Sequence, residues 1–596
     1  MKPQNATIRI LSLLKDQKKM VAFLLFLIVA AAGLDIVVPF FSQRLIDTLV
    51  SFLQTGGEAP YQALFLIAAG ILVATVLNRI IASIYNVEVF KTVTRAEDKA
   101  RHQAFEKYLY LHALFHHGSS SGQLIGRIDR GAVAIYVILY EIIGHSLISP
   151  LVTLLGVLVV LAVKSPWIAL AVFLPLPIYT LIVRRLAWRI YTIEQQVSDE
   201  YETVSKEAYD VAGNVLTVKK FSQEDAETAH HVQLLKQMRT TQYAAERLWG
   251  IMETTQTVIA TVGRISVILL GGYFVVIGQS TIGEFVLFIT LQNMAYSPLA
   301  QLSNVFPRLR RNLSRAERIF GILDEPLHVT DTSSAKELPP LAKDVVFANV
   351  SFRYGPERQW ALRNISLTIP AGKTVALVGR SGSGKTTFIN LLLRSFDPTE
   401  GGIAIDGHDL RDVTQESLHR QIAVVPQEVD LFSRTIGDNI AYGYGTLHPH
   451  TSQGVGAGPS RDAIVTAAKT ALAHDFILKT EKGYDTLVGE RGIKLSGGER
   501  QRIGIARAVF RDPRILILDE ATSHLDTESE RLIREATDTL VKGRTSFIIA
   551  HRLSTVLHAD IILVFAHGEL EAMGTNEELL AKSPTYKRLY DLQFSA

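Results

Sequence analysis

The sequence predicts a multi-domain membrane protein, with an all-α, six-helix transmembrane domain followed by an α/β P-loop nucleotide-binding domain. Long apolar runs alternate with charged, helix-favouring stretches in the first half, whereas the second half has short apolar strands, glycine turns and amphipathic helices. A phosphate-binding motif begins at Gly379. Of the 596 residues, 48% are hydrophobic and only 20% charged, so the chain is too apolar for an ordinary soluble enzyme and too long for one domain.

Charge and cysteine content exclude several classes of function. The net charge of +3 is small for this length, so it does not favour a nucleic-acid partner. The chain has no cysteine, which excludes disulfides, thiolate zinc sites and a cysteine nucleophile.

Six apolar stretches are long enough, with their flanks, for the ~20 residues that a bilayer crossing demands. They are Met20–Phe40, Ala63–Tyr85, Val133–Val152, Ala169–Val183 with its flanks, Val258–Ile277 and Ile282–Leu302. A polar, proline-containing stretch follows them and marks a boundary. We therefore expect a transmembrane domain over residues 1–323, a linker over 324–342 and a nucleotide-binding domain over 343–596.

The distribution of Lys and Arg predicts the orientation in the membrane. Positive residues are concentrated before the first span and in the connections Val87–Arg130 and Leu186–Trp249, while Ser51–Pro60 and Gly278–Thr281 contain none. Because positive connections stay in the cytoplasm, we expect both termini and the nucleotide-binding domain there, in a bacterial cytoplasmic (inner) membrane. The two positive connections are predicted to be helical extensions of the spans. We expect their tips, Gly118–Gly122 and the region around Ala208–Gly213, to dock on the nucleotide-binding domain and carry its motion to the membrane; the alternative is that they are solvated hairpins.

The phosphate-binding motif is the strongest local signal. Residues 379–386 fit G-x-x-x-x-G-K-[ST] between a predicted strand, Thr374–Val378, and a predicted helix, Thr386–Leu393. Its glycines let backbone N–H groups face the phosphates of ATP, its lysine neutralises their charge and its threonine hydroxyl meets Mg²⁺. The predicted ATP-binding residues here are Gly379, Arg380, Ser381, Gly382, Ser383, Gly384, Lys385, Thr386 and Thr387, with Thr386 also a metal ligand.

A second strand supplies acidic groups. Arg514–Leu518 reads as a buried strand that ends in Asp519, and Glu520 follows. We expect Asp519 to orient Mg²⁺ through water and Glu520 to act as the general base for the attacking water.

Between these two motifs, Leu495–Gln501 reads Leu-Ser-Gly-Gly-Glu-Arg-Gln and matches the signature of ATP-binding cassette (ABC) proteins. The whole chain resembles an exporter-type half-transporter of that family. The resemblance implies that the signature of one protomer closes over ATP held by the cradle of another, in a homodimer or alternatively a heterodimer. The signature residues that it places on the nucleotide are Ser496, Gly497, Gly498 and Glu499.

Other family elements match single positions. Tyr354 resembles the aromatic residue that stacks on adenine, Gln427 the glutamine that senses Mg²⁺ and water, and His551 the switch histidine that contacts the γ-phosphate. By this resemblance the catalytic group is Glu520, His551 and Gln427, and the metal group is Thr386, Gln427 and Asp519. The resemblance also assigns Asp526 to the loop that communicates between the two sites and Val488–Gly492 to the segment that senses the membrane domain.

Two features depart from the family pattern. His524 stands where a small residue is usual in the Ser-x-Leu-Asp loop, and Tyr444–Ser460 is a longer, Gly/Ser/His-rich stretch. We interpret the stretch as a surface insertion.

The sequence of the membrane half indicates the cargo less clearly than the second half indicates ATP. Polar groups within membrane spans are expensive and usually face the bundle interior or water. They could form ion pairs, such as Arg79 or Arg264 with Glu141, or line a cavity for an amphipathic or anionic cargo. Gly122–Gly131 is also similar to a stretch of the heavy-metal and glutathione-conjugate exporters. The candidates are Asp35, Asn78, Arg79, Glu141, His145, Glu253, Gln256, Arg264, Gln292 and Asn293.

These observations predict an ATPase that drives export, or flipping, of an amphipathic organic substrate across the lipid bilayer by alternating access. The alternatives are an ATP-gated channel or regulator, and a lipid flippase. The intact signature and Glu520 favour turnover over gating, and six spans exclude a soluble cassette ATPase.

Overall fold

The structure is a computed structural model that describes residues 6–55, 60–117, 121–355, 357–444, 460–489, 492–519, 527–550 and 556–594. The chain divides into two compact units. The first consists of Met1–Leu111 and His116–Glu325, and the second of His112–Phe115 and Pro326–Ala596.

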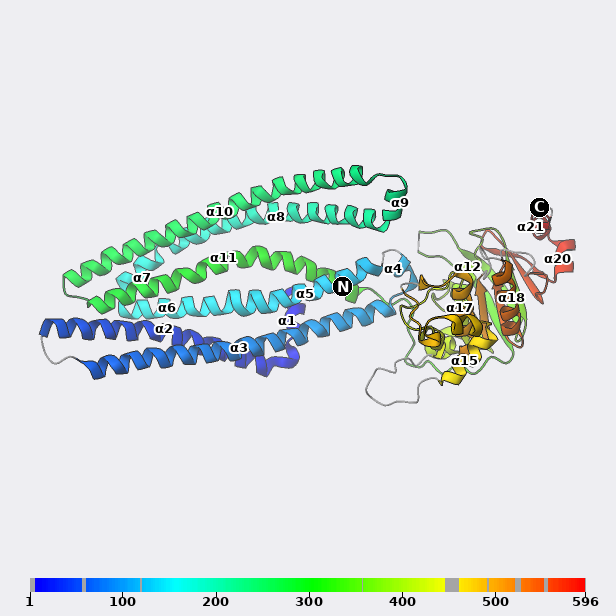
Figure 1. Cartoon of the computed structure of the whole chain (residues 1–596), viewed down its shortest axis with the longest axis horizontal. Coiled ribbons are helices and arrows are strands. Elements are labelled where there is room, and N and C mark those ends of the chain that lie inside the picture. Colours follow the sequence, from blue (N-terminus) through cyan, green and yellow to red (C-terminus); the bar gives the residue numbers. More distant parts are fainter. Residues whose placement is uncertain are drawn as a thin grey trace. The chain divides into compact units, whose positions relative to one another are not determined.

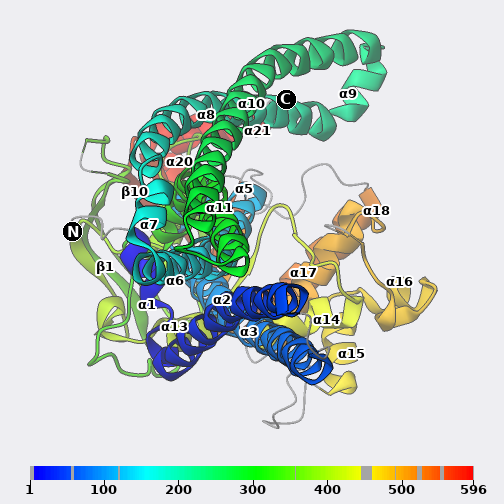
Figure 2. The ribbon, with the colours of Figure 1, turned by 90° about the vertical axis from the view of Figure 1, so that its left-hand side faces the viewer.

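The first unit is built from long helices that run alongside one another (Figure 1). α2 packs on α3 and α8 packs on α10, and an end-on view separates these two pairs (Figure 2). The α-helices of this unit are α1 (Ala6–Ser12), α2 (Lys18–Thr55), α3 (Tyr61–Tyr110), α5 (Ser121–Tyr136), α6 (Ser149–Lys164), α7 (Pro166–Phe173), α8 (Leu176–Gly213), α9 (Val215–Lys220), α10 (Glu224–Val276) and α11 (Ile282–Asp324), while α4 (Ala113–His117) straddles the two units.

Five helical stretches among the described residues are long and apolar enough to cross a membrane: Lys15–Thr55, Tyr61–Tyr110, Leu124–Lys164, Pro166–Gly213 and Glu224–Val276. The sixth predicted span forms the first half of α11. It is not among the five, because Glu284, Gln292 and Asn293 make this stretch more polar than the others.

One predicted boundary was wrong. The third span was expected to end at Val152, but its helix continues to Lys164 and ends only where Ser165 caps α7. Within it, Val137–Ile148 is wound as a π-helix, a rare form that the apolar pattern does not signal.

Helix ends in this unit are fixed by polar contacts. Thr281 and Glu284 form a capping box at the start of α11, so two backbone N–H groups of the first turn are satisfied. Asp47 of α2 accepts a further bond from the Gly283 N–H at 2.9 Å. The beginning of α11 is therefore tied to the end of α2.

The second unit contains two sheets. The smaller sheet has the order β2-β1-β4-β5 and the larger one β10-β9-β3-β8-β7-β6, in which β9, β3, β8, β7 and β6 are parallel. The strands are β1 (Asp344–Phe352), β2 (Leu362–Pro370), β3 (Thr374–Val378), β4 (Glu400–Ile405), β5 (His408–Asp409), β6 (Ile422–Val425), β7 (Ile515–Asp519), β8 (Thr545–Ile549), β9 (Ile561–Ala566) and β10 (Glu569–Gly574).

Helices cover these sheets and form separate cores with them, two of which position the site. α12 shares one core with both sheets, and Leu114 of the short segment His112–Phe115 packs against that core. α14, α15 and α17 share the second core with β6 and β7. The helices of this unit are α12 (Lys385–Leu392), α13 (Gln415–Arg420), α14 (Ile436–Ala441), α15 (Arg461–Thr470), α16 (His474–Lys479), α17 (Gly497–Arg511), α18 (Thr527–Val541), α20 (Asn576–Lys582) and α21 (Pro584–Phe594).

The carboxylate of Asp406 binds the backbone where the chain begins the first strand of the smaller sheet. Asp406 accepts hydrogen bonds from the backbone N–H groups of Ala342, Lys343 and Asp344 at 2.7, 2.8 and 3.0 Å. Burial alone would raise the pKa of Asp406, but these bonds to the ionised form outweigh it, so its pKa lies below the ordinary value.

We predict that Asp406→Ala lowers the free energy of unfolding of the second unit by about 1–2 kcal/mol at pH 7, because three N–H groups lose a charged acceptor. Since the folded-state pKa is lowered, this contribution is present above the unfolded value of about 3.9 and is lost as the pH falls through the folded pKa. Thermal unfolding of the full chain over a pH series tests this. Hydrogen exchange at residues 342–344 should rise in the variant, and unchanged exchange there would contradict the assignment.

Candidate functional site

The phosphate-binding loop lies between β3 and α12, as predicted from the sequence. Gly379 and Gly384 adopt φ angles of 156° and 110°, which residues with a side chain rarely adopt. A Cβ at Gly379 would lie 2.4 Å from the Phe565 carbonyl oxygen, and one at Gly384 would lie 2.6 Å from the Leu362 side chain. The loop therefore needs glycine at both positions.

Lys385 and Ser383 are buried within this loop. The Lys385 ammonium donates to the carbonyl oxygens of Gly379 and Arg380 at 2.7 and 3.0 Å, so it lies across the loop. Burial lowers the pKa of Lys385, while the charge of Asp519 acts in the opposite direction. Among the described residues the Ser383 hydroxyl has no hydrogen-bond partner, so it is available to a phosphate oxygen.

Tyr354 lies beside the loop. Its hydroxyl is 3.0 Å from the Thr387 hydroxyl, and its ring meets Phe352 and Phe396 edge-on, with centroids 4.9 and 5.5 Å away. The aromatic residue predicted for adenine is thus next to the first turn of α12. Thr386, by contrast, is exposed at the start of that helix.

Sheet register brings the other predicted groups to the same edge. β3, β8, β7 and β6 are neighbouring parallel strands, and their carboxyl ends meet there. The phosphate loop follows β3, Asp519 ends β7 and Gln427 follows β6 by two residues. This edge is where ligands bind in open parallel sheets.

The signature lies at the start of α17, which packs in a different hydrophobic core from α12, the helix of the phosphate loop. Ser496 caps α17 in a capping box: it accepts from the Glu499 N–H at 3.3 Å, and its own N–H donates to the Glu499 carboxylate at 2.8 Å. Gly498 packs so closely on Ser529 that a Cβ would lie 2.7 Å from its hydroxyl oxygen. α17 belongs to the core of α14 and α15, whereas α12 belongs to the core of the two sheets.

Several predicted residues lie outside the described residues: Glu520, His551, Asp526 and His524, together with 445–459 of the insertion. Residues 490 and 491 of the predicted membrane-domain sensor are also outside. Of the predicted site, the structure therefore places the phosphate loop, Tyr354, Gln427, Asp519 and the signature.

Sequence reasoning missed two contacts near Gln427. Gln501 of α17 donates to the Pro426 carbonyl oxygen at 3.2 Å, and Arg507 donates to the Asp430 carbonyl oxygen at 3.3 Å. Gln501 and Arg507 are six residues apart on α17, a spacing that does not place them on one helix face, so no periodic pattern in the sequence indicated that α17 holds this loop.

The expected ion pairs of Glu141 were also wrong. Glu141 pairs with Arg308, while Arg264 donates to the Asn293 side-chain oxygen at 2.6 Å. Arg79 is in neither of these pairs, and its charge instead interacts with Asp35 of α2. The partner Arg308 lies 167 residues away in α11, beyond the predicted span, so a search within the spans could not find it.

Two family models match the chain: the ABC transporter transmembrane region over residues 21–299 and the ABC transporter model over residues 362–523. The ATP-dependent lipid A-core flippase of Syntrophus aciditrophicus is 48% identical over 333 residues, which are 56% of this chain and 53% of that protein. The chain thus spans about half the length of that relative.

Other similarities extend over nearly the whole chain. The beta-(1→2)glucan export ATP-binding/permease protein NdvA of Rhodopseudomonas palustris is 34% identical over 595 residues, covering 98% of this chain and 95% of that protein. The solved structure of a bacterial Atm1-family ABC exporter with ATP bound superposes with a TM-score of 0.82 at 30% identity, covering 97% of this chain and 98% of that one. With a multi-pass helical membrane unit fused to an ATP-binding unit, the chain belongs to the ABC transporter family, as an exporter-type half-transporter whose ATPase drives export or flipping.

Proposed function

We propose that two copies of the chain form the working transporter and that each ATP is held between the phosphate loop of one copy and the signature of the other. The observation that carries this proposal is the separation of the two motifs. The phosphate loop extends from the core of the two sheets, whereas Ser496 begins α17 on the other core. A second copy supplies the missing signature to each loop.

The described residues fit Mg²⁺ together with ATP. The Ser383 hydroxyl lacks a partner in the described part of the chain, and Lys385 lies across the loop. Asp519 ends β7 and Gln427 follows β6, and these neighbouring strands end at the same sheet edge. Thr386, Gln427 and Asp519 would hold the ion, which when bound neutralises charge on the phosphates.

Within each site the chain's own groups have separate roles. Lys385 neutralises the phosphates, Glu520 takes the proton from the attacking water, and His551 and Gln427 position that water. The pairing closes when ATP is bound and reopens after hydrolysis, which alternates access to the cargo site.

We further propose that both termini and the second unit are cytoplasmic, in a bacterial inner membrane, and that the helical tips transmit motion to the membrane. The positive connections support the orientation. His112–Phe115, which precedes the first tip, groups with the second unit, and this supports docking near that tip. Leu216 and Phe221, which follow the second tip at α9, are exposed and provide an apolar surface suited to docking.

The cargo, we infer, is an amphipathic organic molecule with an anionic group. Arg264 lies 12 residues before the end of α10, about 18 Å along the helix, near the middle of a bilayer core of about 30 Å. In the described part of the chain its partner is the neutral Asn293 and no carboxylate. A charge at this depth needs polar surroundings or a ligand of opposite charge.

Neighbouring amides support the same inference. Gln256 of α10 and Gln292 of α11 each have a buried side-chain atom without a hydrogen-bond partner among the described residues. Such atoms cost free energy unless a ligand or water satisfies them. Relatives named for lipid A-core and for glucan show that the family's cargo varies, so the site itself must indicate the class.

We predict that Glu520→Gln retains ATP binding but lowers hydrolysis by about 10²- to 10⁴-fold and traps a closed pair, because the general base is lost. ATP binding, phosphate release and the spacing of the two copies are measured together. Glu528→Gln, an exposed acid in α18, serves as the control and should behave like the parent. Full hydrolysis in Glu520→Gln would overturn the assigned base.

Lys385→Ala should instead weaken ATP binding, by about 10- to 100-fold, because a charged donor to the phosphates is lost. Lys373→Ala, which removes an exposed lysine paired with Asp560 at 3.1 Å, is the matched control. Equal ATP affinity in the two variants, measured by titration, would refute the role of Lys385.

The cargo class is tested by ATPase stimulation in lipid vesicles with lipids, glutathione conjugates, peptides and uncharged drugs, followed by transport of any compound that stimulates. Anionic amphiphiles should stimulate the parent, and Arg264→Gln should lose this response by roughly 10-fold or more. Arg44→Gln, near the end of α2 outside the apolar run, should keep the response. Stimulation of Arg264→Gln equal to that of the parent would contradict an anionic cargo.

A further inference from the structure

The joining segment, residues 325–343, lies between the end of α11 and the start of β1. From Thr330 onward it packs on the rest of the second unit. Lys336 N–H donates to the Asp412 carbonyl oxygen and Thr414 N–H to the Lys336 carbonyl oxygen, both at 3.0 Å, as in a short parallel strand pair. Leu338 N–H donates to the Ser417 hydroxyl at 2.9 Å. Leu338 and Leu341 are buried in the core that also contains α12. The joining segment is thus part of the nucleotide unit and not a free tether.

One buried side chain connects this segment to the helix of the phosphate loop. Arg394 comes directly after the residue that caps α12, with φ of 49°, and its exposed fraction is only 3%. Its guanidinium donates to the Thr330 and Val413 carbonyl oxygens at 3.3 and 2.9 Å. Each of its three nitrogens has a hydrogen-bond acceptor, which suits the rigid, planar guanidinium.

Two carboxylates share Arg394 but lie in different parts of the chain. Asp397, 3.2 Å away, is on the same loop as Arg394, whereas Asp331, 3.6 Å away, is in the joining segment. Asp331 also accepts from the Gln415 N–H at 3.0 Å, at the start of α13. Asp331 thus holds the joining segment through two contacts, one with Arg394 and one with Gln415. Asp397 makes no such link, because it is outside the joining segment.

Few residues lie between the contact of Thr330 with Arg394 and the end of α11. α11 ends at Asp324, so only residues 325–329 separate it from Thr330. Five residues span at most about 17 Å when fully extended. The end of α12 and the end of α11 are therefore connected through a short length of chain.

We propose that Arg394 is a positioning residue for the transport cycle: with Asp331 it locks the joining segment to the helix of the phosphate loop, so that ATP binding moves α11 through the backbone itself. This route is additional to any docking of the helical tips. The inference rests on the proposed function, since it requires that ATP binding changes the membrane unit.

The test uses the absence of native cysteine, which lets a single introduced cysteine carry a spin label. Leu53→Cys is suitable because Leu53 is 78% exposed near the end of α2. Distances between the two labels of a pair are measured in lipid nanodiscs, without nucleotide and with saturating ATP plus vanadate. ATP affinity is measured in parallel with a fluorescent ATP analogue.

Asp331→Ala and Asp397→Ala are compared in this labelled background, because both remove a carboxylate from Arg394 but only the first loosens the joining segment. Asp331→Ala should keep the parent's ATP affinity, while the ratio of shifted to unshifted labels falls by roughly 2- to 30-fold. Asp397→Ala should shift as the parent does. Insertion of Gly-Ser-Gly-Ser after Pro326 lengthens the connection to α11 but leaves the contact of Asp331 with Arg394 intact. It should act like Asp331→Ala.

The outcomes separate the inference from the function on which it rests. A parent whose labels do not move with ATP plus vanadate refutes the ATP-driven transport cycle. If the parent moves and Asp331→Ala moves equally, or if Asp397→Ala loses the shift to the same degree, the role of Arg394 and Asp331 is overturned.

Discussion

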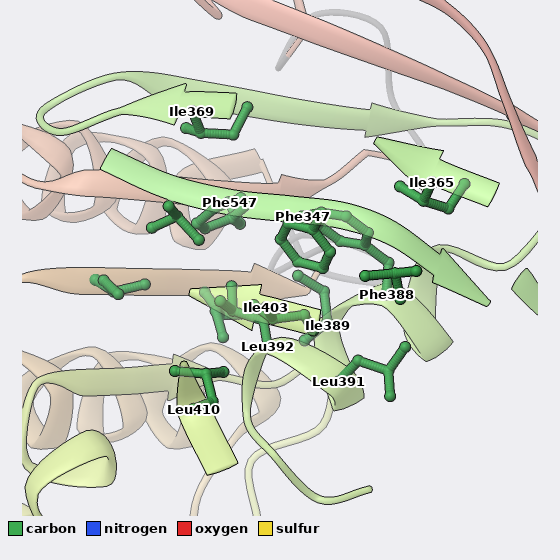
Figure 3. Close-up of a cluster of buried hydrophobic side chains, with 14 of the residues drawn as sticks. Phe347, Ile365, Ile369, Phe388, Ile389, Leu391, Leu392, Ile403, Leu410 and Phe547 are labelled. Carbon is green, nitrogen blue, oxygen red and sulfur yellow. The ribbon is translucent and has the colours of Figure 1, made fainter. Parts of the chain in front are cut away.

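The burial of Phe388 beneath the phosphate loop is the contact on which the nucleotide unit depends. Its ring stacks on Phe347 of β1 with centroids 4.2 Å apart, and its centroid lies 6.2 Å from that of Phe547 of β8 (Figure 3). The ring of Phe565 of β9 is 5.5 Å away, centroid to centroid. One side chain therefore fixes α12 against both sheets. Its loss would leave a cavity of a kind that costs about 3–5 kcal/mol. The direction of α12, and with it the position of Lys385, follows from this packing.

The phosphate loop, the strands around it and the apolar helices were predictable because each is encoded locally. A glycine that needs positive φ, or a lysine three residues after Gly382, is visible in the chain itself. Arg394, Asp406 and the partner of Glu141 were not predictable, because their contacts join residues 62 to 167 positions apart. Such contacts depend on tertiary packing, and the sequence pattern around each residue is that of an ordinary surface loop or helix.

The two units illustrate opposite uses of charge. In the second unit, charged side chains such as Asp406 are satisfied by backbone groups and fix the course of the chain. In the membrane unit, Glu141 is neutralised by Arg308, while Arg264 meets only an amide among the described residues. Satisfying Asp406 adds stability to the second unit, whereas the charge of Arg264 remains available to attract a bound molecule.

The length of α10 has a mechanical consequence. Its 53 residues extend over about 80 Å, whereas the bilayer core accounts for only about 30 Å. More than half of the helix is therefore a rod outside the hydrocarbon, stiffened along its course by α8. Such a rod has the proportions of a lever that pivots at the membrane surface: a small tilt of its outer end would reach the part inside the bilayer as a smaller but stronger displacement.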